Sequence, residues 1–203
     1  MEPATLVSSP ALTGGIKPFA FAQVPGTIVS MSEFRVARAT VDEAPAAAAI
    51  LREAAEWLEA MGQKNWEPEW FTPESMVPNA ERGELWLAWD GNDPVGTMLV
   101  AATDEDFWPE DQPGEALYVH KLAVARRAAG RGVAQALLLQ AEAEAQRVGS
   151  PKLKLDCRAD RPKLQALYEG AGFQRVDERV VFGWLHVVRY EKLPVLAHKI
   201  ELS

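Results

Sequence analysis

The feature that most constrains this chain is a strand-like segment that leads through two glycines into a helix. Residues 118–124 form an apolar run with β-branched side chains, which predicts a strand. After a turn, Arg127-Ala128-Ala129-Gly130-Arg131-Gly132, apolar side chains recur at helical spacing: Val133, Ala134, Leu137, Leu138, Ala141, Ala145 and Val148. The first N–H groups of a helix have no partner within it, and the helix dipole adds partial positive charge there. The unit therefore predicts an anion site, at which a phosphate can approach glycines that carry no Cβ.

A glycine turn alone also caps many ordinary helices, so its spacing decides how it is interpreted. This turn lacks the third glycine of the dinucleotide-binding motif and the Gly-Lys-Ser/Thr of the P-loop. It resembles motif A of the GNAT superfamily of N-acetyltransferases, Arg/Gln-x-x-Gly-x-Gly/Ala, with Arg127, Gly130 and Gly132 at the defined positions. Residues 155–157 and 167–173 resemble the second half of that family's domain, in which a strand is followed by a helix that ends at a Tyr…Gly-Phe sequence. The resemblance covers roughly residues 34–193.

The order of the apolar patterns predicts an α/β domain with a mixed sheet. Asp42 is the expected N-cap of the first helix, and Gly62 its end. The GNAT resemblance implies the acyl-CoA N-acyltransferase fold, a mixed, mostly antiparallel sheet of about seven strands with helices on both faces. The expected strands lie at 34–39, 84–90, 95–103, 115–124, 152–157, 173–181 and 184–193, and the helices at 42–61, 73–81, 133–148 and 164–170.

The chain is expected to divide into a flexible N-terminal extension (1–30), a GNAT acetyltransferase domain (31–194) and a C-terminal tail (195–203). Residues 1–30 carry only two charges, show no clear period and lack the basic region of a signal peptide. Met31 leads directly into the first strand pattern, which favours Met31 as the natural start.

Composition narrows the class of protein. A formal net charge of −8 argues against a nucleic-acid partner, which would be expected to meet a basic face. No apolar run approaches the about 20 residues of a membrane span, so a cytoplasmic protein without a membrane partner is expected. The single cysteine, Cys157, cannot form an internal disulfide. Three scattered histidines and one cysteine offer no metal-ligand spacing, so no metal is expected.

The resemblance implies acetyl-CoA as cosubstrate. Backbone amides of the glycine turn are expected to hold its pyrophosphate, and the main chain of Leu122 and Val124 its pantetheine arm. An N–H near Leu122 is expected to stabilise the thioester oxygen. Arg161 stands where the family often has asparagine, and it can reach a phosphate or lie in solvent. The expected cofactor-binding residues are Leu122, Ala123, Val124, Arg127, Ala128, Ala129, Gly130, Arg131, Gly132, Val133, Ala134 and Arg161.

Two residues are expected to manage protons. In the family, the tyrosine matched by Tyr168 donates a proton, or a hydrogen bond, to the departing sulfur of CoA. His120 precedes Leu122 by two residues, which places the two side chains on one strand face under a period of two. His-x-Leu-Ala-Val is similar to a motif of arylalkylamine N-acetyltransferases, in which the histidine serves proton removal. Glu115 and a water chain are competing candidates for the base.

The sequence says less about the acceptor. The acidic loop 104–111 can attract a cationic amine or simply be solvated, and Trp66, Trp108 and Tyr118 are candidate substrate contacts. The prediction is a single-domain N-acetyltransferase, monomeric or homodimeric. It acetylates a primary amine, on a small molecule or on a protein or peptide, by direct attack without an acyl-enzyme. The alternatives are a non-catalytic CoA-binding sensor or interaction module on the same fold, and a nucleotide-binding protein.

Overall fold

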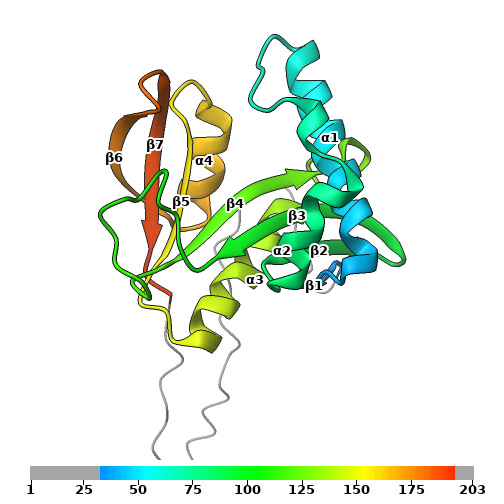
Figure 1. The fold of residues 1–203 in the computed structure, drawn as a ribbon, viewed down its shortest axis with the longest axis horizontal. Helices are drawn as coiled ribbons and strands as arrows, with labels where there is room; N and C mark the ends of the chain where they lie inside the picture. The colour runs from blue at the N-terminus through cyan, green and yellow to red at the C-terminus, as the bar shows by residue number, and fades with distance from the viewer. Residues whose placement is uncertain (1–32, 195–203) are drawn as a thin grey trace, which may run out of the picture.

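The computed structural model describes residues 33–194, so the predicted N-terminal extension and C-terminal tail lie outside the described residues. The chain forms a seven-stranded sheet with the order β1-β2-β3-β4-β5-β7-β6 (Figure 1). All neighbouring strands are antiparallel except β4 and β5. The strands are β1 (Arg35–Arg38), β2 (Leu85–Asp90), β3 (Asp93–Ala101), β4 (Leu117–Val124), β5 (Leu153–Arg158), β6 (Gln174–Val181) and β7 (Leu185–Lys192).

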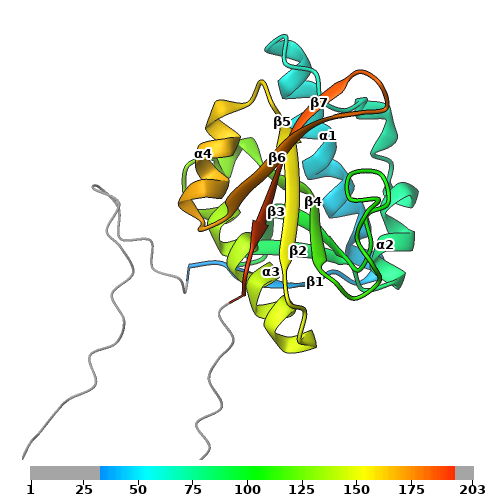
Figure 2. The same ribbon diagram turned by 90° about the vertical axis from the view of Figure 1, so that its left-hand side faces the viewer.

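Helices cover both faces of this sheet. The α1 and α2 helices lie on one side and α3 and α4 on the other (Figure 2). The helices are α1 (Ala44–Ala60), α2 (Val77–Glu81), α3 (Val133–Val148) and α4 (Pro162–Gly170), with short 3-10 segments η1 (Val41–Glu43), η2 (Pro68–Trp70), η3 (Pro73–Met76) and η4 (Arg126–Ala128). The predicted fold, a mixed and mostly antiparallel seven-stranded sheet between helices, is confirmed.

Each face of the sheet has its own apolar core. The alanine-rich stripe of α1, with Ile50 and Leu51, packs on Leu87 and Leu99 of the sheet. On the other face, Leu137 and Leu138 of α3 share a cluster with Tyr168 of α4 and with residues of β3, β4, β5 and β7. Both faces of the sheet are covered, and β4 and β5 lie at its centre.

The two parallel strands separate after a short contact. Their pairing covers three positions and ends at Val119 opposite Leu155. Beyond that point β4 leans towards α1 and β5 rises beside α4, so the two strands form a fork that opens at the top of Figure 1. Both predicted catalytic residues, His120 and Tyr168, belong to the elements that border this fork.

Local details of the elements differ from the expectations. Asp42 is not the N-cap: Thr40 begins the 3-10 turn that leads into α1, and its N–H donates to the carboxylate of Glu43 at 2.8 Å. The predicted end of α1 is confirmed, since Gly62 follows the helix with a φ of +67°. Over residues 33–194, none of the helices is both long enough and apolar enough to cross a membrane.

Candidate active site

The edge of β4 beyond the fork is the first component of the site. From His120 to Val124 this strand pairs with β3 alone, because the ladder with β5 stops at Val119. The β5-facing backbone of these residues therefore has no strand partner within residues 33–194. An extended, amide-containing ligand can add to such an edge as a further strand would.

The same part of β4 contains a bulge. Thr97 of β3 pairs with Ala123, whereas Leu99 pairs with His120, so β4 holds one extra residue here. Lys121 lies in this bulge and has a φ of +49°, a conformation that is uncommon outside glycine. The bulge shifts the alternation of side chains by one position.

This shift corrects the expectation that His120 and Leu122 share a face. Val119 and Leu122 both pack on the α3 side of the sheet, although an unbroken period of two would separate them. His120 follows Val119 directly and therefore points to the opposite side, which carries α1 and the loop 102–116. Leu122 therefore faces the α3 side of the sheet, and His120 faces the α1 side.

The glycine turn has the geometry of an anion cradle. Gly130 and Gly132 adopt φ values of +78° and +92°, and α3 starts directly afterwards at Val133. Within the described residues, no acceptor takes the backbone N–H of Gly130, Gly132 or Val133, and the first helical hydrogen bond is from Ala136 to Gly132. Left-handed glycines and unpaired amides at a helix start fit a phosphate group.

The arginine side chains of this turn have another task. Arg127 donates to both carboxylate oxygens of Asp93 at 2.9 and 2.7 Å, and Arg131 donates to Asp90 and Glu33, each at 2.7 Å. These contacts fasten the turn to the β2–β3 hairpin and the chain just before β1. The main chain of the turn, rather than its arginine side chains, is thus the part available to an anion.

Tyr168 lies on the inner face of α4. Its residue is 5% exposed, and its ring packs against Phe173 and Tyr190 with centroid distances of 6.2 and 6.0 Å. The hydroxyl makes no hydrogen bond to any residue in the described range. Burial raises its pKa well above the ordinary value, and the nearby Cys157 and Asp156 add to the rise. The hydroxyl is therefore protonated at neutral pH and has no competing acceptor.

A compact polar cluster occupies the base of the fork on the other face. It consists of Asp104 from the loop after β3, His120 from β4 and Asp156 from β5, with one polar atom of each within 4.8 Å of the others. The Nε2 atom of His120 is 3.7 Å from Oδ2 of Asp104. The other Asp104 oxygen accepts the N–H of Phe107 at 3.1 Å.

Burial sets the protonation of this cluster. It raises the pKa of Asp104 to about 6, with a contribution from Asp106 and Asp111. It raises the pKa of Asp156 to about 7, and the Asp104 carboxylate adds to this rise. It lowers the pKa of His120 to about 4, an effect that Lys121 strengthens and Glu84 opposes. At neutral pH His120 is uncharged and can accept a proton, while the two carboxylates are close to their titration range.

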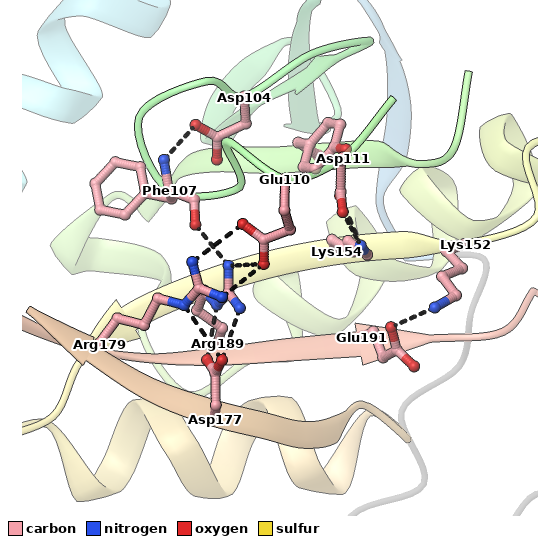
Figure 3. Close-up of polar contacts among 11 residues, drawn as sticks. Asp104, Phe107, Glu110, Asp111, Lys152, Lys154, Asp177, Arg179, Arg189 and Glu191 are labelled. Atoms are coloured by element: carbon pink, nitrogen blue, oxygen red, sulfur yellow. Dashed lines mark hydrogen bonds and ion pairs between the residues drawn. The ribbon is translucent and has the colours of Figure 1, made fainter. Parts of the chain in front are cut away.

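Ion pairs hold the loop 102–116 against the sheet. Figure 3 shows Lys154 on Asp111, and Arg189 between Asp177 and Glu110. The side chains of Lys154 and Arg189 are only 4% and 2% exposed. Arg189 also donates to the carbonyl of Phe107 at 2.9 Å. These bonds fix the loop that carries Asp104.

Two of the predicted substrate contacts, Trp108 and Tyr118, instead contact the residues that hold the loop 102–116 in place. Trp108 is 3% exposed and lies between the cations of Lys154 and Arg189, at 4.3 and 4.0 Å from its ring centroid. Tyr118 is 2% exposed and donates its hydroxyl to Asp111 at 2.6 Å. Both side chains are nearly fully buried, and together with Asp104 they line a small cavity of about 90 Å³ beneath the loop.

The remaining candidates lie around the opening. Arg161 donates to the carbonyl of Gln63 at 2.7 Å and pairs with Asp160, so it connects the start of α4 to the segment after α1. Trp66 packs on the α1 core with its ring against Phe71. Glu115 accepts the N–H of Gln112 at 3.0 Å within its own loop and is not a member of the polar cluster.

Sequence reasoning missed Asp156. Its strand alternates apolar Leu153, Leu155 and Cys157 with charged residues, which is typical of a half-exposed strand. The charged face is covered because the loop 102–116 folds over it, and that placement has no local signal. The charged residues of this central strand were the one sequence feature that could have indicated a buried polar site.

Comparison with known proteins identifies the family. The model of the "Acetyltransferase (GNAT) family" matches residues 51–173, which include the bulged strand, the cradle and Tyr168. The chain belongs to the GNAT acetyltransferase family. The uncharacterized N-acetyltransferase YesJ of Bacillus subtilis is 25% identical over 147 residues, which are 70% of this chain and 82% of YesJ.

Solved GNAT structures share the fold. A GNAT-family acetyltransferase of Listeria monocytogenes superimposes with a TM-score of 0.65 at 24% identity, over 79% of this chain and 94% of its own. The PaiA N-acetyltransferase of Thermoplasma acidophilum, solved in complex with coenzyme A, has a TM-score of 0.63 at 14% identity and covers 78% of this chain and 99% of its own. The predicted enzyme class, a GNAT N-acetyltransferase, is confirmed.

Proposed function

We propose that this GNAT enzyme transfers an acetyl group from acetyl-CoA directly to a primary amine while both substrates are bound. The observation that carries the proposal is the fork itself. The unpaired edge of β4 runs from the anion cradle to a point where Tyr168 and His120 lie on opposite sides of the sheet. A cosubstrate and an acceptor can therefore meet there from two faces.

The chain offers fitting groups along the whole length of the cosubstrate. The amides of Gly130, Gly132 and Val133 suit its pyrophosphate, and the backbone of Leu122 and Val124 suits the amides of its pantetheine arm. When bound there, acetyl-CoA supplies an acetyl group activated as a thioester. An N–H at the bulge would hold the carbonyl oxygen as charge develops on it.

Proton transfers complete the reaction. The acceptor enters as an ammonium group and loses one proton through neutral His120 to solvent, so that its nitrogen has a free electron pair. That pair forms the bond to the carbonyl carbon as the carbon–sulfur bond breaks. Tyr168 gives its proton to the sulfur, and the second proton lost by the nitrogen restores Tyr168. The sum is one amide, one free thiol and one proton released.

The surroundings of the cysteine support direct transfer. Burial raises the pKa of Cys157 to about 12, and the side chain packs in the apolar cluster beneath α3. A buried, protonated thiol is a poor nucleophile. An acyl-enzyme on Cys157 is therefore disfavoured, and the acceptor attacks the thioester itself.

Calorimetric titration with acetyl-CoA tests the cradle. Gly132→Glu places a carboxylate where the phosphates are expected, so the dissociation constant should rise at least about tenfold. The matched control is Gly149→Glu at the opposite end of α3, because Gly149 also has a positive φ, of +71°. Equal affinity in the two variants would refute the cradle. Release of free thiol across a set of primary amines tests the reaction.

A further inference from the structure

The polar cluster at the base of the fork is unusual because its members lack partners. The Asp104 side chain is only 6% exposed, yet its Oδ2 atom makes no hydrogen bond. Among residues 33–194, Asp156 has no hydrogen-bond or ion-pair partner, and His120 has only the 3.7 Å approach to Asp104. Buried carboxylates are normally paired, since an unpaired buried charge is costly.

Other acids of the same region show the normal pattern. Asp111 is paired with Lys154 and Tyr118, and Glu110 with Arg179 and Arg189. The loop thus satisfies the acids that anchor it and leaves Asp104 open towards the fork. Such an exception is expected where a ligand supplies the missing donor.

We infer that Asp104 and Asp156 form the receptor for the ammonium head of an alkylamine acceptor, with His120 beside it. The inference rests on the proposed function and specifies its substrate class: a strongly basic aliphatic amine, which arrives with a positive charge and three N–H donors. Weakly basic aromatic amines, uncharged at neutral pH, would not satisfy the two carboxylates.

The position of the cluster suits this task. His120 and Asp156 each follow the last residue of the β4–β5 ladder, so the cluster lies where β4 and β5 begin to separate. Asp156 also contributes to the electrostatic environment of Tyr168. A nitrogen held by the cluster would lie beside His120, one of the two groups assigned to proton transfer.

The charges around the cluster leave room for a cation. Lys121 interacts with both Asp104 and His120, but it forms no ion pair with any residue in 33–194, and burial lowers its pKa. Glu84 faces His120, while Arg189 acts on Asp156 but is already held by Asp177 and Glu110. The two carboxylates thus exceed the free positive charge near them.

The cluster is wide enough to hold an ammonium nitrogen. Two acceptors about 2.8 Å from one tetrahedral nitrogen lie about 4.6 Å apart. Ligands about 2.1 Å from a tetrahedral zinc ion lie about 3.4 Å apart. The Asp104–His120 separation of 3.7 Å lies between these two values, and the 4.8 Å limit on the whole cluster includes the ammonium spacing. The zinc titration described below therefore separates an ammonium receptor from a metal site.

Titration with butylammonium chloride, monitored by NMR of histidine-labelled protein without CoA, tests the receptor. The imidazole signal of His120, assigned by its loss in His120→Gln, should shift in a saturable manner. Asp104→Asn and Asp156→Asn should each weaken binding at least about tenfold, because each removes one charged acceptor. Glu105→Gln, which removes an exposed acid of the same loop, should bind like the wild type.

Tetramethylammonium chloride has the charge but no N–H donors, and it should leave the His120 signal unchanged. A shift equal with both salts, no shift with butylammonium, or unchanged affinity in both aspartate variants would overturn the inference. Stoichiometric binding of zinc chloride, lost in Asp104→Asn, without butylammonium binding would also overturn it in favour of a metal site. Acetyl-CoA affinity is measured separately, so a failed receptor and a failed acetyltransferase assignment give different results.

Discussion

Replacing Asp156 with asparagine should stabilise the folded protein at alkaline pH and lose that benefit in acid. The pKa of Asp156 is about 7 in the folded chain, against about 3.9 for an unfolded aspartate. A carboxyl group whose pKa rises on folding favours the folded state while it is protonated. Its contribution is full below about pH 4 and is lost as the pH rises through 7.

The magnitude follows from these two pKa values. One pKa unit corresponds to about 1.4 kcal/mol, so the ionised Asp156 costs the folded state about 4 kcal/mol well above pH 7. Between pH 8 and pH 5 the wild type recovers about 3 kcal/mol of this cost as the group is protonated. Asparagine cannot ionise, so the variant lacks this change.

Urea unfolding at pH 5, 6, 7 and 8, at one ionic strength, measures the effect. The free energy of unfolding of Asp156→Asn minus that of the wild type should be positive at pH 8 and smaller by about 3 kcal/mol at pH 5. His120 titrates in both proteins, so its contribution largely cancels in the difference. Glu105→Gln controls for loss of one negative charge. A difference that does not vary with pH, or a less stable variant at pH 8, would refute the reasoning.

Three further changes probe other parts of the molecule. Tyr168→Phe should lower kcat about a hundredfold with unchanged acetyl-CoA affinity, and normal turnover would remove its role as acid. Gly96→Ala should cost about 1–3 kcal/mol in urea unfolding, because its Cβ would lie 2.5 Å from Cγ1 of Val133; an unchanged midpoint would contradict this. Arg189→Met should cost about 3 kcal/mol, because it removes a buried guanidinium that binds Asp177, Glu110 and the carbonyl of Phe107, and amide exchange in loop 102–116 should accelerate; unchanged exchange would show that the loop is held otherwise.

Much of the fold follows from local patterns. The seven strands and the glycine turn carry alternation, helical spacing and glycine signals that operate over a few residues. The left-handed turn of Gly130 and Gly132 before α3 could therefore be predicted, as could the position of Tyr168 near Gly172 and Phe173. Helix α1 was located correctly, although its N-cap was not, because Asp42 and Thr40 are both good capping residues.

The candidate site was less accessible because it depends on contacts between distant segments. No glycine or proline marks the bulge at Lys121 in the sequence. The expected alternation of side chains along a regular strand therefore placed His120 wrongly on the same face as Leu122. The burial of Asp104 and Asp156 follows from a loop tied down by Arg189 and Lys154, about 40 to 80 residues away in sequence. Neither fact is encoded in any single short window.

The extra residue in β4 has a consequence for how related chains are compared. A sequence aligned to this one without a gap at position 121 would, if its strand were regular, carry all later residues on the reverse side of the sheet. Its counterpart of Leu122 would then point to the side of the sheet that carries α1, the same side as its histidine. One inserted amino acid thus changes which side chains of β4 lie on each face of the sheet. When site residues are matched between two such proteins, the alignment at this bulge should be checked first.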